Sequence, residues 1–98
     1  MFARATRIEG TPDRLEEAIR QFRAQTLPAA QGQAGFGGGM LLADRESGAA
    51  MAVTLWETED NMHASEQFAD QQRTHVAAAA GGSGQPRVEH YEVAVPLG

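Results

Sequence analysis

The stretch GFGGGMLLADRESGAAMAVTLW, residues 35–56, decides the fold of this chain. Two apolar runs of strand length flank the polar segment Asp44–Gly48. That segment ends in glycine and suits the loop of a β-hairpin. The sequence therefore predicts two antiparallel strands joined by a short turn at the centre of the chain.

Both faces of the predicted hairpin are largely apolar. In the first strand, one face carries Phe36, Gly38, Met40 and Leu42, and the other carries Gly37, Gly39 and Leu41. In the second strand, Ala50, Ala52, Thr54 and Trp56 alternate with Met51, Val53 and Leu55. A sheet with one face in water would show a polar set in each strand, so we expect both faces to be covered. The three consecutive glycines lack the residues of a phosphate loop and indicate close backbone approach or a bulge.

A helix is predicted before the hairpin. Thr11 suits the N-cap and Pro12 the first helical position. Pro28 cannot donate to the helical ladder, so the helix is expected to kink or restart near Leu27. Its core face has the spacing of an amphipathic helix: Leu15, Ala18, Ile19 and Phe22.

A second helix is predicted after the hairpin. Thr58 is its cap, a break is expected near Asp70, and the glycines at 81, 82 and 84 end it before Pro86. Its inward stripe is Met62, Ser65, Phe68, Ala69, Gln72, Val76 and Ala79.

The two ends of the chain supply the outer strands. Residues 1–8 alternate as a strand, and residues 87–95, RVEHYEVAV, form a last strand. The order strand, helix, strand, strand, helix, strand predicts an α+β, ferredoxin-like βαββαβ fold with a four-stranded antiparallel sheet. Two helices cover one face of such a sheet. A homodimer that packs sheet on sheet would cover the other.

Composition narrows the class of protein. Ninety-eight residues suit a single domain, residues 1–98. The net charge of −5 argues against nucleic acid as a partner. No segment has the length of a membrane span or the form of a signal peptide, so we expect a cytoplasmic protein that does not enter a membrane. There is no cysteine, and His, Asp and Glu show no spacing typical of a metal site.

Segments along nearly the whole chain carry a family resemblance: FARATRIEG, TPDRLEEAI, LPA, GFGGGMLLADRESG, VTLWETED, ASE and VEHYEVAV. In this order and spacing, the chain resembles the antibiotic biosynthesis monooxygenase-like family of dimeric α/β barrels. The resemblance implies that fold. It leaves the activity open, because the fold hosts cofactor-independent oxygenases, haem-degrading enzymes and proteins without demonstrated chemistry.

By this resemblance, Trp56 lines a pocket between sheet and helices and stacks on a flat aromatic substrate. The alternative is that Trp56 only anchors the core. Arg4 either pairs with a carboxylate such as Glu92 or stabilises an oxyanion or peroxide. We also expect substrate contacts from Thr6, Thr54, Met40, Phe68 and Tyr91.

Two histidines are candidate bases. His90 and Tyr91 are neighbours on the last strand and face opposite sides, so one could serve the pocket and the other the dimer. His75 lies at the edge of the second helix's inward stripe and matches, by position, a haem-ligating histidine of the haem-degrading branch. Two departures count against haem: Thr6 stands where that branch has Asn, and Ser65 where it has a second Trp.

Three functions follow from these observations. The first is a cofactor-independent monooxygenase that oxidises a small or polycyclic phenol or quinol, with Trp56, His75, Arg4 and His90 as catalytic residues. The second is haem binding or degradation. The third is a non-catalytic dimeric ligand-binding module.

Overall fold

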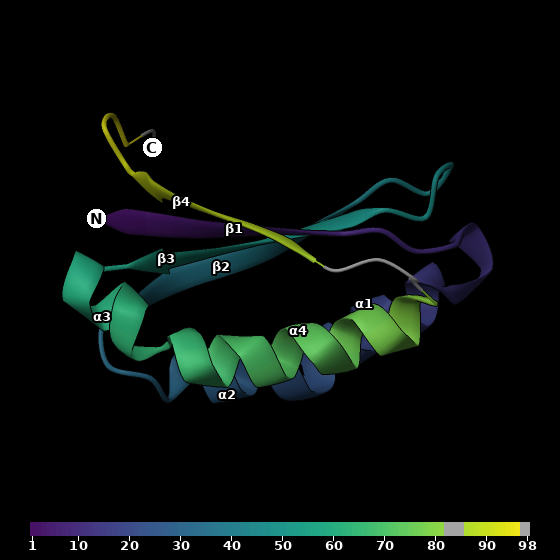
Figure 1. Cartoon of the computed structure of the whole chain (residues 1–98), viewed down its shortest axis with the longest axis horizontal. Coiled ribbons are helices and arrows are strands. Elements are labelled where there is room, and N and C mark those ends of the chain that lie inside the picture. Colours follow the sequence, from purple (N-terminus) through teal and green to yellow (C-terminus); the bar gives the residue numbers. More distant parts are fainter. Residues whose placement is uncertain (82–85, 97–98) are drawn as a thin grey trace.

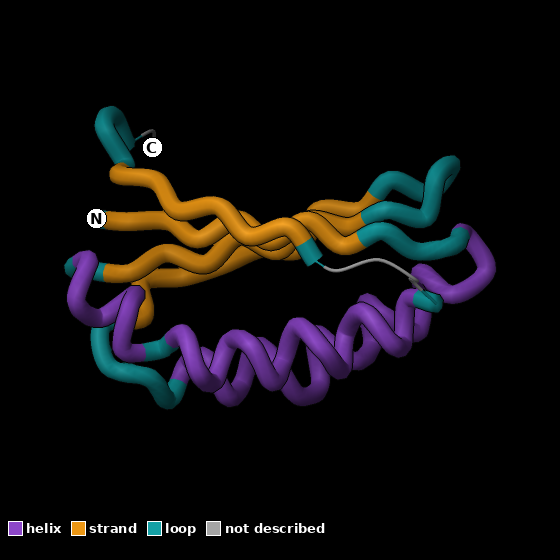
Figure 2. Tube along the Cα trace, in the orientation of Figure 1, coloured by secondary structure: helices purple, strands orange, loops and turns teal. Residues whose placement is uncertain are grey.

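The computed structural model describes residues 1–81 and 86–96. It has two layers, a twisted sheet and a layer of helices against one of its faces (Figures 1 and 2). The sheet has the antiparallel order β2-β3-β1-β4. This confirms the predicted ferredoxin-like arrangement. The strands are β1 (Phe2–Ile8), β2 (Phe36–Ala43), β3 (Ala50–Trp56) and β4 (Arg87–Glu92).

Strand β1 lies inside the sheet and fixes which side chains meet the helices. Arg4 pairs with Thr54 on β3 and with His90 on β4, and Thr6 pairs with Ala52. Arg4, Thr6 and Ile8 are buried, while Arg7 on the alternate face is exposed. The even-numbered residues of β1 therefore face the helices.

A bulge changes the predicted alternation of β2. The register shifts between Phe36 and Gly38: Phe36 pairs with Trp56, whereas Gly38 pairs with Leu55. Phe36 therefore lies on the helix side, and the prediction that it shares a face with Met40 and Leu42 is wrong. Gly38 has a φ of 125°, which side chains rarely tolerate. The predicted bulge is confirmed, and the register shift is its consequence.

The first helical segment restarts where the proline predicts. It consists of a 3₁₀ turn η1 (Pro12–Arg14), α1 (Leu15–Gln21), a π-helical stretch η2 (Phe22–Thr26) and α2 (Leu27–Gln31). In the π stretch, the Leu27 N–H donates to the Phe22 carbonyl, and Pro28 lies in the first turn of α2. Thr11 occupies the N-cap position as predicted, but its side chain makes no capping hydrogen bond.

The second helical segment breaks earlier than predicted. It divides into α3 (Glu59–Ala64) and α4 (Glu66–Ala80), so the break lies at Ser65 and not near Asp70. Thr58 caps α3 by accepting a hydrogen bond from the Asn61 N–H, as predicted. Gly81 ends α4 with a φ of 74°. The glycines predicted at 82 and 84 lie outside the described residues, and β4 stops at Glu92, short of the predicted residue 95.

No helix formed by the described residues lies over the second face of the sheet (Figure 1). Met40, Leu42 and Tyr91 on or beside this face are each about half exposed, at 51%, 50% and 53%. The sheet itself is also open at β2 and β4, so this chain alone does not form the barrel that the resemblance implies. Among the described residues, no helix is long and apolar enough to span a membrane.

Candidate functional site

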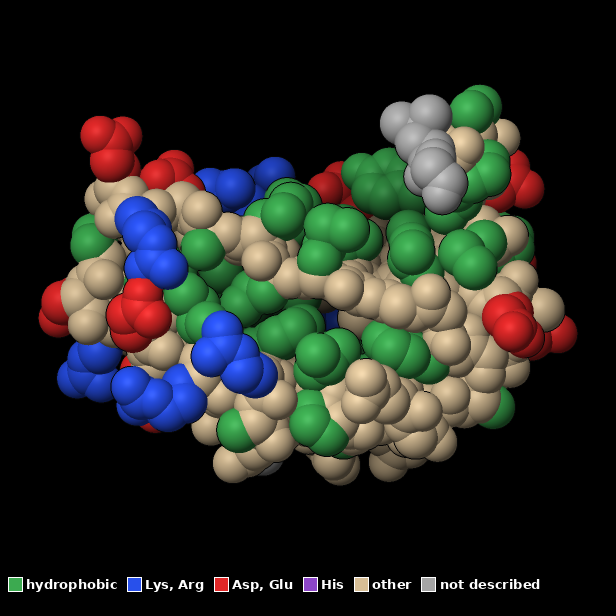
Figure 3. Space-filling view, turned by 180° about the vertical axis from the view of Figure 1, so that it is seen from behind, with side chains coloured by type: hydrophobic (Ala, Val, Ile, Leu, Met, Phe, Trp, Pro, Cys, Tyr) green, Lys and Arg blue, Asp and Glu red, His purple; other side chains and the backbone are tan. Residues whose placement is uncertain are grey.

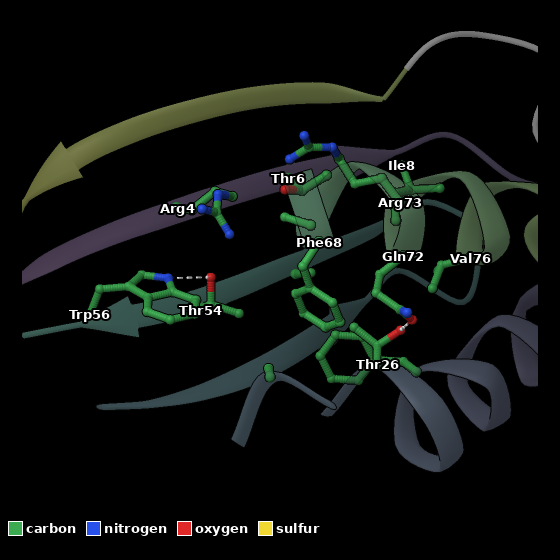
Figure 4. Close-up of a pocket in the computed structure, with 14 residues that line it drawn as sticks. Arg4, Thr6, Ile8, Thr26, Thr54, Trp56, Phe68, Gln72, Arg73 and Val76 are labelled. Atoms are coloured by element: carbon green, nitrogen blue, oxygen red, sulfur yellow. Dashed lines mark hydrogen bonds between the residues drawn. The ribbon is translucent and has the colours of Figure 1, made fainter. Parts of the chain in front are cut away.

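A cavity of about 50 Å³ lies between the sheet and the helices (Figure 4). Strands β1 and β3 form one wall, and η2, α2 and α4 form the other. Most of the lining is apolar, and polar groups enter from several elements. The lining residues are Arg4, Thr6, Ile8, Phe22, Thr26, Ala30, Ala52, Thr54, Trp56, Phe68, Ala69, Gln72, Arg73 and Val76.

Trp56 is almost fully buried at one end of this cavity, with 1% of its surface exposed. Its indole N–H donates to Thr54 Oγ1 at 3.0 Å, as drawn in Figure 4. The ring of Phe36 meets it edge-on at 5.6 Å, and Arg4 Cζ lies 5.5 Å from its centroid. The indole is therefore fixed by an aromatic contact, a hydrogen bond and a cation–π contact.

Arg4 is a buried cation, with 4% of its surface exposed. Its Nη2 donates to the Met62 carbonyl at 2.6 Å and to Ser65 Oγ at 2.7 Å. Both acceptors lie where α3 gives way to α4, so the helix break turns two oxygens toward the guanidinium. Burial lowers the pKa of Arg4, and the nearby Glu66 carboxylate opposes that shift. Arginine remains protonated under all ordinary conditions.

Glu66 is the shared carboxylate of the site. Its Oε2 lies 2.9 Å from Arg4 Nε and 3.9 Å from Arg73 Nη1. Its Oε1 lies 2.9 Å from His90 Nε2. This confirms an ion pair for Arg4, but the predicted partner Glu92 is wrong: Glu92 lies opposite Phe2 at the exposed end of β4.

Two arginines that line the cavity thus share one carboxylate, Glu66, which does not itself line it. The contact of Arg4 Nε with Glu66 lacks the alignment of a hydrogen bond. Arg73 Nη1 is likewise buried without a hydrogen-bond partner among the described residues. The second nitrogen of Arg73 pairs with the exposed Asp70. An anion in the cavity would meet donors that the described part of the chain leaves incompletely satisfied.

The structure brings together five of the residues predicted for the site and separates others. Arg4, Thr6, Thr54, Trp56 and Phe68 line the cavity. Met40 does not, because the bulge in β2 places it opposite Val53 on the open face. Tyr91 lies opposite Ala3 on that same open face.

Of the two candidate bases, the structure describes the side chain of His90 and not that of His75. His90 is on the helix side of β4, but it is exposed and binds Glu66 without lining the cavity. His75 belongs to α4, and its side chain lies outside the described residues. No three His, Asp or Glu side chains in the described part of the chain gather closely enough to hold a metal ion.

Sequence reasoning missed three polar groups of the site. Arg73 and Gln72 line the cavity, and Gln72 Oε1 accepts a hydrogen bond from Thr26 Oγ1 at 3.0 Å. Glu66 holds both arginines. The predicted inward stripe includes Gln72 but gives it no role in the site. Arg73 is its sequence neighbour, which a strict helical stripe assigns to the side of the helix.

Haem does not fit this cavity. Its volume of about 50 Å³ is far below the roughly 300–1,000 Å³ of pockets that hold drug-sized or cofactor-sized molecules, so neither haem nor the whole of a polycyclic phenol lies within it. Ser65, which stands where the haem-degrading branch has a tryptophan, is buried and bonded to Arg4. Ser65 is therefore part of the hydrogen bonding around Arg4, and it does not line the cavity.

Proteins similar in sequence to this chain are longer than it is. No protein-family model matches it. The uncharacterized protein Rv2557 of Mycobacterium tuberculosis (strain ATCC 25618 / H37Rv) is 37% identical over 94 residues, which cover 96% of this chain and 41% of that protein. The uncharacterized protein Rv2558 of the same strain is 36% identical over 95 residues, covering 97% and 39%. The chain thus spans about two fifths of the length of these relatives.

Solved structures share the architecture along nearly the whole chain. A monooxygenase from the gene ActVA-Orf6 of Streptomyces coelicolor, in complex with Nanaomycin D, superposes with a TM-score of 0.75 at 16% identity, covering 99% of this chain and 91% of that one. SnoaB, a cofactor-independent oxygenase from Streptomyces nogalater, superposes with a TM-score of 0.72 at 17% identity, covering 98% and 95%.

The chain has the fold of the antibiotic biosynthesis monooxygenases. At these identities the likeness concerns the fold, and the chemistry of the site has to be argued from this chain's own residues.

Proposed function

We propose that this chain is a cofactor-independent monooxygenase that oxidises a small or polycyclic electron-rich phenol or quinol beside Trp56. One observation carries the proposal: a cavity between sheet and helices has an indole at one end and is lined by two arginines, Arg4 and Arg73, which share the carboxylate Glu66 outside the lining. The neighbours in fold include one oxygenase described as cofactor-independent, which supports the class of reaction.

The chemistry requires little from the protein beyond charge and exclusion of water. An ionised substrate passes one electron to dioxygen, and the resulting radical and superoxide combine to form a carbon–oxygen bond. For anthrone, the peroxide then loses water, so that anthrone and O₂ give anthraquinone and H₂O. Each step develops negative charge in an apolar space, where fixed positive groups are most effective.

The arginines are the groups suited to that task. Arg4 and Arg73 line the cavity, whereas their carboxylate partners Glu66 and Asp70 do not, so the charged groups that the lining presents to a ligand are positive. A positive wall favours the ionised form of a phenol and stabilises superoxide. Among the described lining residues there is no carboxylate and no imidazole. We therefore assign the stabilisation of the phenolate to the arginines, and His75 stays a candidate base.

Oxygen uptake tests the proposal. With anthrone or a naphthoquinol as substrate, we expect uptake that falls about tenfold or more in Arg73→Gln, while Arg73→Lys retains part of the rate because it retains the charge. Trp56→Phe should raise KM by loss of the larger ring. Arg20→Gln, an exposed change remote from the cavity, is the matched control. No uptake with any of these substrates would contradict the proposal and favour a ligand-binding module.

A hemin titration separates this proposal from the haem alternative. Because the cavity is too small for the macrocycle, we expect no shift of the Soret band at micromolar protein. A saturable shift that is lost in His75→Ala would instead support haem binding.

We further propose that the working form is a homodimer joined through the open sheet face. The exposed apolar side chains on that face support it, because a sheet face of this kind is normally covered. Packing a second sheet there would also complete the barrel that this chain lacks on its own.

A further inference from the structure

A second, larger hollow lies outside the cavity, between the edge strand β2 and the helices. It has a volume of about 380 Å³, within the range of small-molecule sites. We call it the β2 groove. Figure 3 shows hydrophobic side chains gathered around a hollow on this side of the molecule, with basic side chains at one end. The groove is lined by Ile19, Phe22, Arg23, Leu27, Gly39, Met40, Leu41, Ala43 and Arg45.

Phe22 is shared by the β2 groove and the cavity. It lines both hollows, and it begins the π-helical stretch. A ligand in the groove that contacts Phe22 therefore contacts a side chain that also lines the cavity. Because the cavity holds only about 50 Å³, most of a polycyclic substrate would have to lie on the groove side of Phe22.

The charge of the β2 groove is of one sign. Among the described residues that line it, the charged ones are Arg23 and Arg45, in a chain whose net charge is −5. Arg45 pairs with the exposed Glu16. Arg23 makes no ion pair with the described part of the chain, and its side chain is exposed. An apolar hollow with two arginines is complementary to an amphipathic anion.

We propose that the β2 groove binds an aromatic acid, with its apolar body against Ile19, Leu27 and Leu41 and its carboxylate on Arg23 and Arg45. The statement that this acid carries a phenol or quinol ring rests on the proposed oxygenase function. The statement that its carboxylate binds Arg23 and Arg45 rests only on the lining of the β2 groove. The substrate of this chain is then a phenol or quinol that carries a carboxylate on the side remote from the reacting ring.

Calorimetric titration with a matched pair of probes tests this inference. 6-Hydroxy-2-naphthoic acid carries the carboxylate, and its methyl ester has the same ring and phenol without the charge. We expect the acid to bind about tenfold more tightly than the ester at low salt, and the difference to shrink at high salt as screening weakens the ionic contacts.

Exposed substitutions assign the effect to the groove. Arg23→Gln and Arg45→Gln should each weaken binding of the acid about two- to fivefold and leave binding of the ester unchanged. Glu16→Gln should strengthen binding of the acid, because it removes the carboxylate that competes for Arg45. Arg20→Gln is the control: Arg20 lies in α1, directly before the stretch that carries Arg23, pairs with Glu17 and does not line the groove.

The outcomes separate this inference from the proposed function. Equal binding of acid and ester, or acid binding that neither groove variant weakens, overturns the carboxylate site even when oxygen uptake is observed. Acid-selective binding that depends on Arg23 and Arg45, together with no oxygen uptake from any phenol, supports the site and refutes the oxygenase.

Discussion

Glu66 sets the charge of the cavity wall, since it is the carboxylate between Arg4 and Arg73. In Glu66→Gln, the two arginines keep their charges and lose that counter-ion. We expect the free energy of unfolding to fall by about 1–3 kcal/mol, because a buried cation loses its partner. We expect binding of a naphtholate to strengthen, because the wall becomes more positive.

Chemical unfolding and ligand titration of the same variant measure the two effects. Glu17→Gln is the matched control, since Glu17 pairs with an exposed arginine on the helix surface and such pairs contribute little. Unchanged stability in Glu66→Gln, or weaker binding of the naphtholate, would show that Glu66 does not hold the arginines as described.

The sequence predicts about half of the site at this scale. Arg4, Thr6, Thr54 and Trp56 stand on alternate positions of two strands, and strand pairing brings them to one face. The partner of Arg4 was not predictable by the same means. Glu66 lies directly after the helix break at Ser65, where Arg4 donates hydrogen bonds to the Met62 carbonyl and to Ser65 Oγ. These contacts join residues about 60 positions apart, so local sequence rules do not give them.

The hairpin turn is an element whose glycine is required. Gly48 has a φ of 83°, and a side-chain carbon there would lie 2.3 Å from the Thr11 carbonyl carbon. Gly48→Ala should therefore cost about 1–3 kcal/mol or more of unfolding free energy. Gly32→Ala is the control, because Gly32 has helical angles and space for the added carbon. It should be neutral or slightly stabilising. Equal effects of the two changes in urea unfolding would argue against the packing of the turn on residues 11 and 12.

Asp44 gives the same hairpin a pH-dependent contribution. Its Oδ1 accepts hydrogen bonds from the Glu46 and Ser47 N–H groups at 3.0 and 3.4 Å, and these lower the pKa of Asp44 below its ordinary 3.8. A lowered pKa means that the stabilisation is complete above about pH 4 and is lost as the pH falls through the folded-state value. Asp44→Ala should lower the melting temperature at pH 7. The difference in melting temperature between this variant and the unchanged protein should disappear as the solution is acidified. A difference that does not depend on pH would show that the charge of the Asp44 carboxylate does not contribute.

Elements were predicted better than their registers. The hairpin, the restart at Leu27 and the Thr58 cap follow from local rules about glycine, proline and capping residues. The face of Phe36 does not, because three consecutive glycines permit a bulge without fixing its position. The bulge lies between Phe36 and Gly38, where Gly38 has a φ of 125°. Gly39 beyond it is closely packed: an added carbon there would lie 2.9 Å from the Val53 carbonyl oxygen.

At the scale of the whole molecule, the two apolar faces of the hairpin differ in what covers them. The helices cover one face, and the described structure leaves Met40, Leu42 and Tyr91 exposed on or beside the other. Patterning predicts that this second face is buried, but it does not identify what covers it. For that reason the dimer is a proposal, while the two-layer fold is an observation.

Sedimentation of the intact chain tests the dimer. We expect the unchanged protein to sediment at twice the mass of the chain at micromolar concentration. Val53 lies opposite Met40 at the middle of the open face, so Val53→Glu would place a charge in the interface and should yield monomers. Ala24→Glu adds the same charge at an exposed position of the helical layer and should leave the dimer intact.

Because the open face lies on the opposite side of the sheet from the cavity, a folded Val53→Glu monomer that still binds naphtholate would show that the pocket is complete within one chain. A monomeric unchanged protein, or a Val53→Glu variant that remains dimeric, would place the contact elsewhere.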